Sequence, residues 1–160
     1  YEEEVKNLLY FPISLTKKVQ NKFDAIKKKK VGIHLRLGDY RAKSTKGVFH
    51  KIDYSLYLNN ATKQFGDDYE FLIFSDDLNL LKQEVNLKNF VNLKNDNEIE
   101  DLYSLSQCDS TIISNSSFSW WGSFLGKTKE KVICPDKWFG PRGPLDSYDI
   151  YEDSWIKISV

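Results

Sequence analysis

The stretch Val31–Tyr40, VGIHLRLGDY, constrains the fold of this chain more than any other segment. Apolar residues alternate with Gly, His and Arg along its first seven residues, which is the period of a β-strand, and a Gly-Asp pair then ends the pattern. An apolar run that follows lysines and ends in Gly-Asp is typical of a buried parallel strand. Ligands of open α/β sheets bind at the carboxyl ends of such strands, so we expect His34, Arg36 and Asp39 to lie where a ligand binds.

Arg36 is one of three arginines in the chain, beside Arg41 and Arg142, and lysine supplies the rest of the positive charge. A guanidinium has a planar fork of donors that lysine lacks, so an arginine at a strand end favours contact with an anion such as a phosphate. In the alternative interpretation Arg36 pairs with Asp39 for structural reasons and His34 is a core histidine. This stretch alone fits both interpretations equally well.

Composition excludes several classes of partner and site. The 160 residues are enough for one domain, and the net charge of zero does not indicate a nucleic-acid or membrane partner. Cys108 and Cys134 are too few and too far apart for a metal site or a disulfide framework, so we predict buried thiols. There is no signal peptide and no apolar run of membrane-spanning length. Because the chain begins at Tyr1 and contains no methionine, we expect it to be a piece of a longer product.

Strand and helix patterns alternate along the chain. The predicted helices cover residues 2–10, 14–29, 53–64, 78–85 and 98–107. The predicted strands cover residues 31–37, 69–74, 89–93, 110–114 and 131–134. Residues 115–126 lead from the fourth strand into a helix, and residues 150–158 form a final docking segment. This order predicts right-handed βαβ units in a single Rossmann-like α/β domain over residues 1–160, with a parallel sheet covered by helices on both faces. Neither GxGxxG nor a P-loop pattern occurs.

Two groups of acidic residues are candidates for ligand contact. Asp76 and Asp77 follow a predicted strand, where they can hold a divalent cation or cap the next helix. No further carboxylate is placed to complete a metal shell, so capping is favoured, with Asp76 available to a ligand. Asp101 lies early in its helix, where the helix dipole alone favours an acid. It can also accept both donors of a guanine edge, but the sequence by itself favours the dipole explanation.

The segment NSSFSWWG, residues 115–122, places several hydroxyls and backbone amides at a helix N-terminus, which is a ready anion site. An ordinary serine cap in front of core aromatics explains Trp120 and Trp121 well. It explains Asn115-Ser116-Ser117 less well, since one capping residue suffices. The aromatic side chains, with Phe118, either pack under the sheet or flank a flat ring.

Four stretches together closely resemble the α-1,2-fucosyltransferases, glycosyltransferase family 11. They occur in the family's order and spacing and cover most of residues 31–139. NSSFSWWG is highly specific to the family and HxRxGDY moderately so. The stretches are IHLRLGDY, FLIFSDD, DLYSLSQCDSTIISNSSFSWWGSFLG and VICPDKWF.

The resemblance implies one lobe of a GT-B-like, metal-independent, inverting enzyme. Such an enzyme moves fucose from GDP-fucose, its donor substrate, to the 2-hydroxyl of a β-galactoside acceptor without a cofactor. By the same resemblance Arg36 holds the pyrophosphate, Asp101 is the guanine-binding acid, and phosphate and fucose contacts fall near Ser117, Phe118 and Ser119. The acceptor's general base is not evident. Asp39 is the nearest candidate, although orienting the arginine suits it better.

The sequence therefore predicts a set of site residues with no metal ligand among them. The predicted catalytic residues are Arg36 and Asp39. The predicted donor-binding residues are His34, Arg36, Asp76, Asp101, Asn115, Ser116, Ser117, Phe118 and Ser119.

The chain departs from the family pattern in two respects. Leu37 stands where the family usually has a second arginine, so we expect one donor contact to be missing or replaced. The glycine-rich GGLGNQ segment and the rest of the acceptor lobe are absent, so the chain resembles a donor-binding half. Two alternatives stay open: a transferase for another GDP-sugar, differing around Phe118, and an idle domain that binds nucleotide or glycan or only dimerises. The expected compartment is the cytoplasm for a bacterial protein and the Golgi lumen for an animal one, and the oligomeric state is open.

Overall fold

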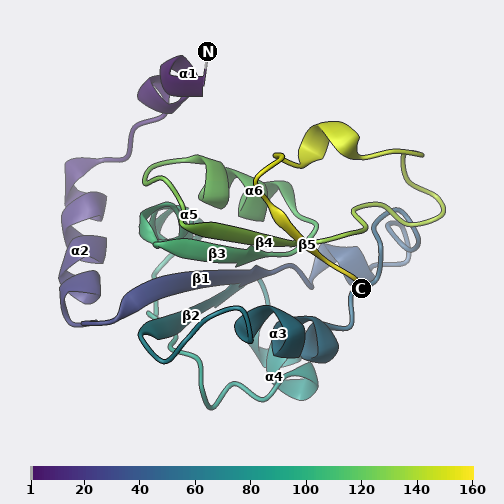
Figure 1. Ribbon diagram of the computed structural model, residues 1–160, viewed down its shortest axis with the longest axis horizontal. Helices are drawn as coiled ribbons and strands as arrows, with labels where there is room; N and C mark the ends of the chain where they lie inside the picture. Colours follow the sequence, from purple (N-terminus) through teal and green to yellow (C-terminus); the bar gives the residue numbers. More distant parts are fainter. Residues whose placement is uncertain (1) are drawn as a thin grey trace.

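The computed structural model describes residues 2–160, which form a five-stranded sheet between two layers of helices (Figure 1). All neighbouring strands are parallel, and their order is β2-β1-β3-β4-β5. The predicted α/β, Rossmann-like architecture is therefore confirmed. The strands are β1 (Lys29–Leu35), β2 (Tyr69–Ser75), β3 (Ser110–Ile113), β4 (Lys131–Pro135) and β5 (Ile156–Ile158).

Helices cover both faces of the sheet (Figure 1). One face carries α3 (Tyr54–Thr62) and α4 (Leu78–Glu84). The other carries α2 (Ile13–Asp24), α5 (Glu98–Gln107) and α6 (Ser117–Phe124). The N-terminal helix α1 (Glu2–Leu8) lies beyond the edge of these layers, and two short 3-10 helices are η1 (Asp39–Arg41) and η2 (Tyr148–Ile150). None of the helices in residues 2–160 has both the length and the apolar character needed to cross a bilayer.

The alternation along β1 separates the two faces of the sheet. Val31, Ile33 and Leu35 are fully buried in the core under α3 and α4. Gly32 faces α5 instead, where an added Cβ would lie 2.9 Å from a side-chain carbon of Leu105. The helix therefore packs directly on the backbone of this strand, which positions the helix N-termini of this layer beside the strand ends.

Three predicted elements differ from the structure. The predicted strand 89–93 is wrong, because only one isolated bridge, Leu72 with Val91, pairs this segment with β2. The helix predicted over 14–29 ends at Asp24, since Lys29 already belongs to β1. The docking segment 150–158 contains a further strand, β5, which pairs with β4 at the sheet edge. Both cysteines are free and buried, as predicted.

Candidate functional site

The candidate site lies at the carboxyl edge of the sheet between β1 and β3. The chain passes from β1 outward to β2 and then returns across β1 to form β3, so the direction of winding changes between these two strands. Such a switch point is where open α/β sheets bind ligands. Among the predicted site residues, His34 lies at the end of β1, and the others follow β1, β2 or β3 or lie in the first turns of α5 and α6.

A chain of hydrogen bonds joins the end of β1 to the first turn of α6. Nδ1 of His34 lies 2.6 Å from Oγ of Ser119, and that hydroxyl lies 3.2 Å from Oγ of Ser114. The backbone amide of Arg36 donates to the same Ser114 hydroxyl at 3.2 Å. Ser119 of the NSSFS segment and Ser114 just before it thus have a structural role, since they fix the helix N-terminus against the strand end.

His34 is a neutral, buried member of this chain. Its side chain is only 3% exposed and its ring centroid lies 4.7 Å from that of Phe118. Burial, with a smaller contribution from the positive charge of Arg36, lowers the pKa of His34 to about 3. A neutral imidazole supplies no charge to an anion, so its part in the site is to support Ser119 and Phe118.

Arg36 is held at one end and open at the other. Its Nε atom bonds to Oδ1 of Asp39 at 2.9 Å and lies 3.4 Å from Oδ2 of Asp76. Within residues 2–160, neither of its two Nη groups makes a hydrogen bond, and the side chain is 31% exposed. The hydrogen bond raises the pKa of Arg36 and lowers the pKa of Asp39. Asp39 is therefore a paired, ionised carboxylate that orients the arginine.

Asp76 and Asp77 have different structural tasks. Asp77 caps α4 by accepting the amide of Leu80 at 2.9 Å, so the capping interpretation is correct for this residue. Asp76 instead reaches across from β2 and accepts the amides of Leu37 and Gly38 at 2.9 and 2.8 Å. Asp76 therefore holds the loop after β1 in place, and both of its oxygens already have partners.

The N-terminus of α6 keeps its donors open. Ser116 is the N-cap residue, yet its side chain makes no capping hydrogen bond. The amides of Ser117, Phe118 and Ser119 have no acceptor within the described part of the chain. Ser117 is exposed and Phe118 is half-buried. Open amides and an exposed hydroxyl in one turn are suited to an anionic ligand.

Asn115 connects three segments of the chain. The side-chain amide of Asn115 donates to the carbonyls of His50 and Trp138 at 2.9 and 2.8 Å. The hydroxyl of Tyr40 donates to the backbone carbonyl of Asn115 at 3.0 Å. The residue is 1% exposed. These contacts describe a structural role at the site and were invisible in the sequence, because they depend on backbone atoms more than 20 positions away.

Asp101 lies in the first turn of α5, partly buried. Asn97 caps this helix, so capping does not account for Asp101. The side chain of Asn95 donates to Oδ1 of Asp101 at 2.8 Å, and burial raises the pKa of the carboxyl. The structure thus leaves its second oxygen without a partner among residues 2–160.

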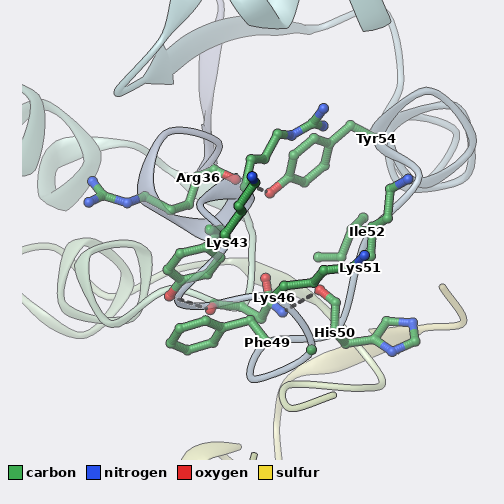
Figure 2. A pocket seen from close by; sticks show the side chains of 12 residues that line it. Arg36, Lys43, Lys46, Phe49, His50, Lys51, Ile52 and Tyr54 are labelled. Atoms are coloured by element: carbon green, nitrogen blue, oxygen red, sulfur yellow. Dashed lines mark hydrogen bonds between the residues drawn. The ribbon is translucent and has the colours of Figure 1, made fainter. Parts of the chain in front are cut away.

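A cavity borders this site and was not predicted from the sequence. It has a volume of about 420 Å³ and is formed mainly by residues 40–54, with only Arg36 and Asn115 from the predicted set (Figure 2). The other predicted residues lie outside it. A lysine-rich loop directly after the HxRxGDY motif was the only sequence signal for it. Its lining residues are Arg36, Tyr40, Arg41, Lys43, Lys46, Gly47, Phe49, His50, Lys51, Ile52, Tyr54 and Asn115.

Comparison with known proteins identifies the family. The sequence profile described as "Glycosyl transferase family 11" matches residues 12–159. The chain belongs to glycosyltransferase family 11. The resemblance seen in the motifs is therefore confirmed over nearly the whole chain.

Two curated relatives come from Escherichia coli. The O-antigen biosynthesis glycosyltransferase WbnK is 30% identical over 135 residues, which are 79% of this chain and 43% of WbnK. An alpha-1,2-colitosyltransferase is 26% identical, with 99% of this chain aligned to 57% of that protein. The family 11 chain thus spans about half the length of the curated relatives that it matches.

Solved structures agree on the fold. Crystal structures of NodZ alpha-1,6-fucosyltransferase, one soaked with GDP-fucose and one co-crystallised with GDP, superpose with TM-scores of 0.56 and 0.55. Each is 13% identical to this chain, and the match covers 79% and 78% of this chain and 46% and 44% of NodZ. The fold is therefore that of one lobe of a GT-B-like enzyme.

Proposed function

We propose that this chain is the donor-binding lobe of an inverting, metal-independent glycosyltransferase that moves fucose from GDP-fucose to the 2-hydroxyl of a β-galactoside. One observation carries the proposal most strongly. The guanidinium of Arg36 is fixed through Nε by Asp39 and Asp76, while neither Nη group has a partner among residues 2–160 at the switch point of the sheet. An oriented fork with free donors is suited to the oxygens of a pyrophosphate.

Each predicted residue has a place in this proposal. Breaking the bond between the sugar C1 and the phosphate oxygen leaves negative charge on the β-phosphate of GDP. The Arg36 fork, the open amides of the first turn of α6 and the Ser117 hydroxyl are placed to offset that charge. Asp101 accepts hydrogen bonds from the guanine edge, and Phe118 contacts the sugar or the base.

The remaining predicted residues position this machinery. Asp39 and Asp76 orient Arg36 and its loop, while His34 and Ser119 hold the first turn of α6 against β1. Ser116 at the N-cap keeps the first turn of α6 in register with them. Asn115 joins the neighbouring loops through the carbonyls of His50 and Trp138, so its role is in stability and not in holding the nucleotide. Hydrogen-bond donors that are already oriented stabilise the charge on the leaving phosphate more than donors that must reorganise.

A second candidate function differs from the first in the donor sugar. One curated relative bears the name alpha-1,2-colitosyltransferase, which favours a transferase for another GDP-sugar as the alternative. Such an enzyme would keep Arg36 and Asp101 and differ in the contacts around Phe118. The two candidates are separated by measuring the turnover of GDP-fucose and of other GDP-sugars by the protein together with an acceptor lobe. Faster turnover of GDP-fucose favours the fucosyltransferase.

A non-catalytic domain is the third candidate, and Leu37 was one of its two supports in the sequence. Leu37 is 1% exposed and packs in the core on the α3 side, whereas His34 and Arg36 face the α6 side. Leucine at this position therefore removes nothing from the face that carries the Arg36 fork. Since both curated relatives are bacterial, we propose the cytoplasm as the compartment.

The proposed function is tested by a substitution that removes the guanidinium of Arg36 and leaves Asp39 and Asp76 unchanged. Truncating one partner of a desolvated charge pair costs about 2–5 kcal/mol, so Arg36→Ala should weaken GDP-fucose binding about 10²–10³-fold by calorimetry. Arg36→Lys should restore little of it, because an ammonium cannot bridge two phosphate oxygens. Arg142→Ala is the control, since that guanidinium donates to the carbonyl of Lys46 instead. Unchanged affinity in Arg36→Ala would rule out the pyrophosphate assignment.

A further inference from the structure

The 420 Å³ cavity lies mainly on the α3 side of β1, away from the first turns of α5 and α6, and Arg36 lines one edge of it. Its residues Ile52 and Tyr54 belong to the core on the α3 side, whereas α5 and α6 cover the other face. Tyr54 Oη donates to the carbonyl of Arg36 at 2.6 Å, so the cavity meets the backbone of that residue. Figure 2 shows the guanidinium of Arg36 pointing away from the labelled lysines. Arg36 thus stands between the cavity and the α6 side.

The cavity is strongly cationic in a chain whose charges otherwise balance. The chain has 23 Lys and Arg and 23 Asp and Glu, but the lining contains no carboxylate. Arg41 is paired with Glu84, and Arg36 with Asp39. The remaining three cations of the lining have no carboxylate within 4 Å in residues 2–160, and they are Lys43, Lys46 and Lys51.

Aromatic rings complete the walls. Tyr40 and Phe49 stack face to face, with ring centroids 3.8 Å apart and an angle of 5° between the rings. Their faces and that of Tyr54 supply flat apolar surface beside the lysines. A volume of about 420 Å³ lies within the range of small-molecule sites. The combination of apolar rings and uncompensated positive charge suits a sugar that carries an acidic group.

We infer that this cavity binds the acceptor and that the acceptor carries an anionic group, a carboxylate or a phosphate ester, close to the accepting sugar. The inference rests on the proposed function and deepens it. A GDP-sugar runs in fixed order from guanine through pyrophosphate to sugar. With guanine at α5 and pyrophosphate at Arg36, the sugar carbon that reacts is directed past Arg36 toward the cavity. The three lysines then face the acceptor and not the donor.

Charge-neutralising variants test the inference. The pocket variant combines Lys43→Gln, Lys46→Gln and Lys51→Gln. The control variant combines Lys17→Gln, Lys28→Gln and Lys88→Gln, three exposed lysines without ion pairs in the described residues. Each protein is saturated with GDP and titrated with galactose 6-phosphate, galacturonate and methyl β-galactoside, followed by NMR. The two acidic probes separate a phosphate from a carboxylate ligand.

The expected result has three parts. At least one acidic probe binds wild type more tightly than the neutral galactoside does. The pocket variant binds that acidic probe about tenfold more weakly than wild type, which is the combined effect of three exposed charge contacts. The control variant and a variant with arginine at the three pocket positions keep the affinity of wild type. The GDP affinity is equal in all four proteins, and added salt weakens binding of the acidic probe only where the charges remain.

Other results would overturn the inference in distinguishable ways. GDP binding without preference for an acidic probe would refute the anionic acceptor and leave the proposed function standing. Weaker GDP binding in the pocket variant would make the cavity part of the donor site. Failure of wild type to bind GDP would remove the proposed function and the inference together.

Discussion

Acidification should destabilise this protein through one buried histidine. The pKa of His34 is about 3 in the folded chain, because its ring is buried, next to Phe118, and lies near the positive charge of Arg36. An unfolded histidine has a pKa of about 6.5. The unfolded state therefore binds more protons below pH 6.5, so the free energy of unfolding falls as the pH drops from 6.5 toward 3 and is unaffected by this group above 6.5. Each pH unit is worth about 1.4 kcal/mol, which gives about 2 kcal/mol at pH 5.

Urea unfolding at pH 7 and pH 5 measures this contribution. His34→Gln removes the titrating ring and keeps a hydrogen-bonding side chain, whereas His50→Gln removes the only other histidine, which is partly exposed. The loss of stability between pH 7 and pH 5 should be about 2 kcal/mol larger in wild type and in His50→Gln than in His34→Gln. Carboxylates contribute equally to all three proteins and cancel in the comparison. Equal losses in the three proteins would refute the buried neutral state of His34.

Three further substitutions test the positioning contacts. Asp76→Asn removes the charge and one acceptor from the loop after β1, so we expect a loss of about 1–3 kcal/mol in urea unfolding together with weaker GDP binding. Gly122→Ala places a Cβ 2.8 Å from that of Leu105, and the resulting overpacking between α5 and α6 should lower the free energy of unfolding by about 1–3 kcal/mol. Asn115→Ala leaves two carbonyls without their donor, which should cost about 2 kcal/mol of stability while GDP affinity stays within threefold in the folded protein. Unchanged stability, or for Asn115→Ala a selective loss of GDP binding, would contradict these assignments.

The parts of the fold that the sequence predicted are those with local causes. Alternating residues and the Gly-Asp break defined β1, and the side chains of Asp53 and Asp77 cap the helices that follow them. The same alternation located Arg36 at a strand end, and in the structure it directly follows β1. These signals act over a few residues, so they can be read without knowledge of the tertiary structure.

The features that the sequence did not predict depend on distant contacts. Residues 89–93 are apolar enough for a strand, but only Val91 reaches β2, so pairing stops after one bridge. The short edge strand β5 forms because β4 supplies its partner groups. Asn115 was expected at the donor, yet its amide is used by carbonyls at His50 and Trp138. The lysine-lined cavity likewise exists only because residues 40–54 fold back over the end of β1.

The central claim is that this chain binds a guanine nucleotide diphosphate through the switch point of its sheet. Calorimetric titration of the wild-type chain with GDP, GDP-fucose and UDP tests it most directly. We predict that GDP and GDP-fucose bind and that UDP binds at least tenfold more weakly, which is about 1.4 kcal/mol for the lost guanine contacts at Asp101. Asp101→Ala should remove this difference. Equal affinity for GDP and UDP in wild type, or no binding of either, would contradict it.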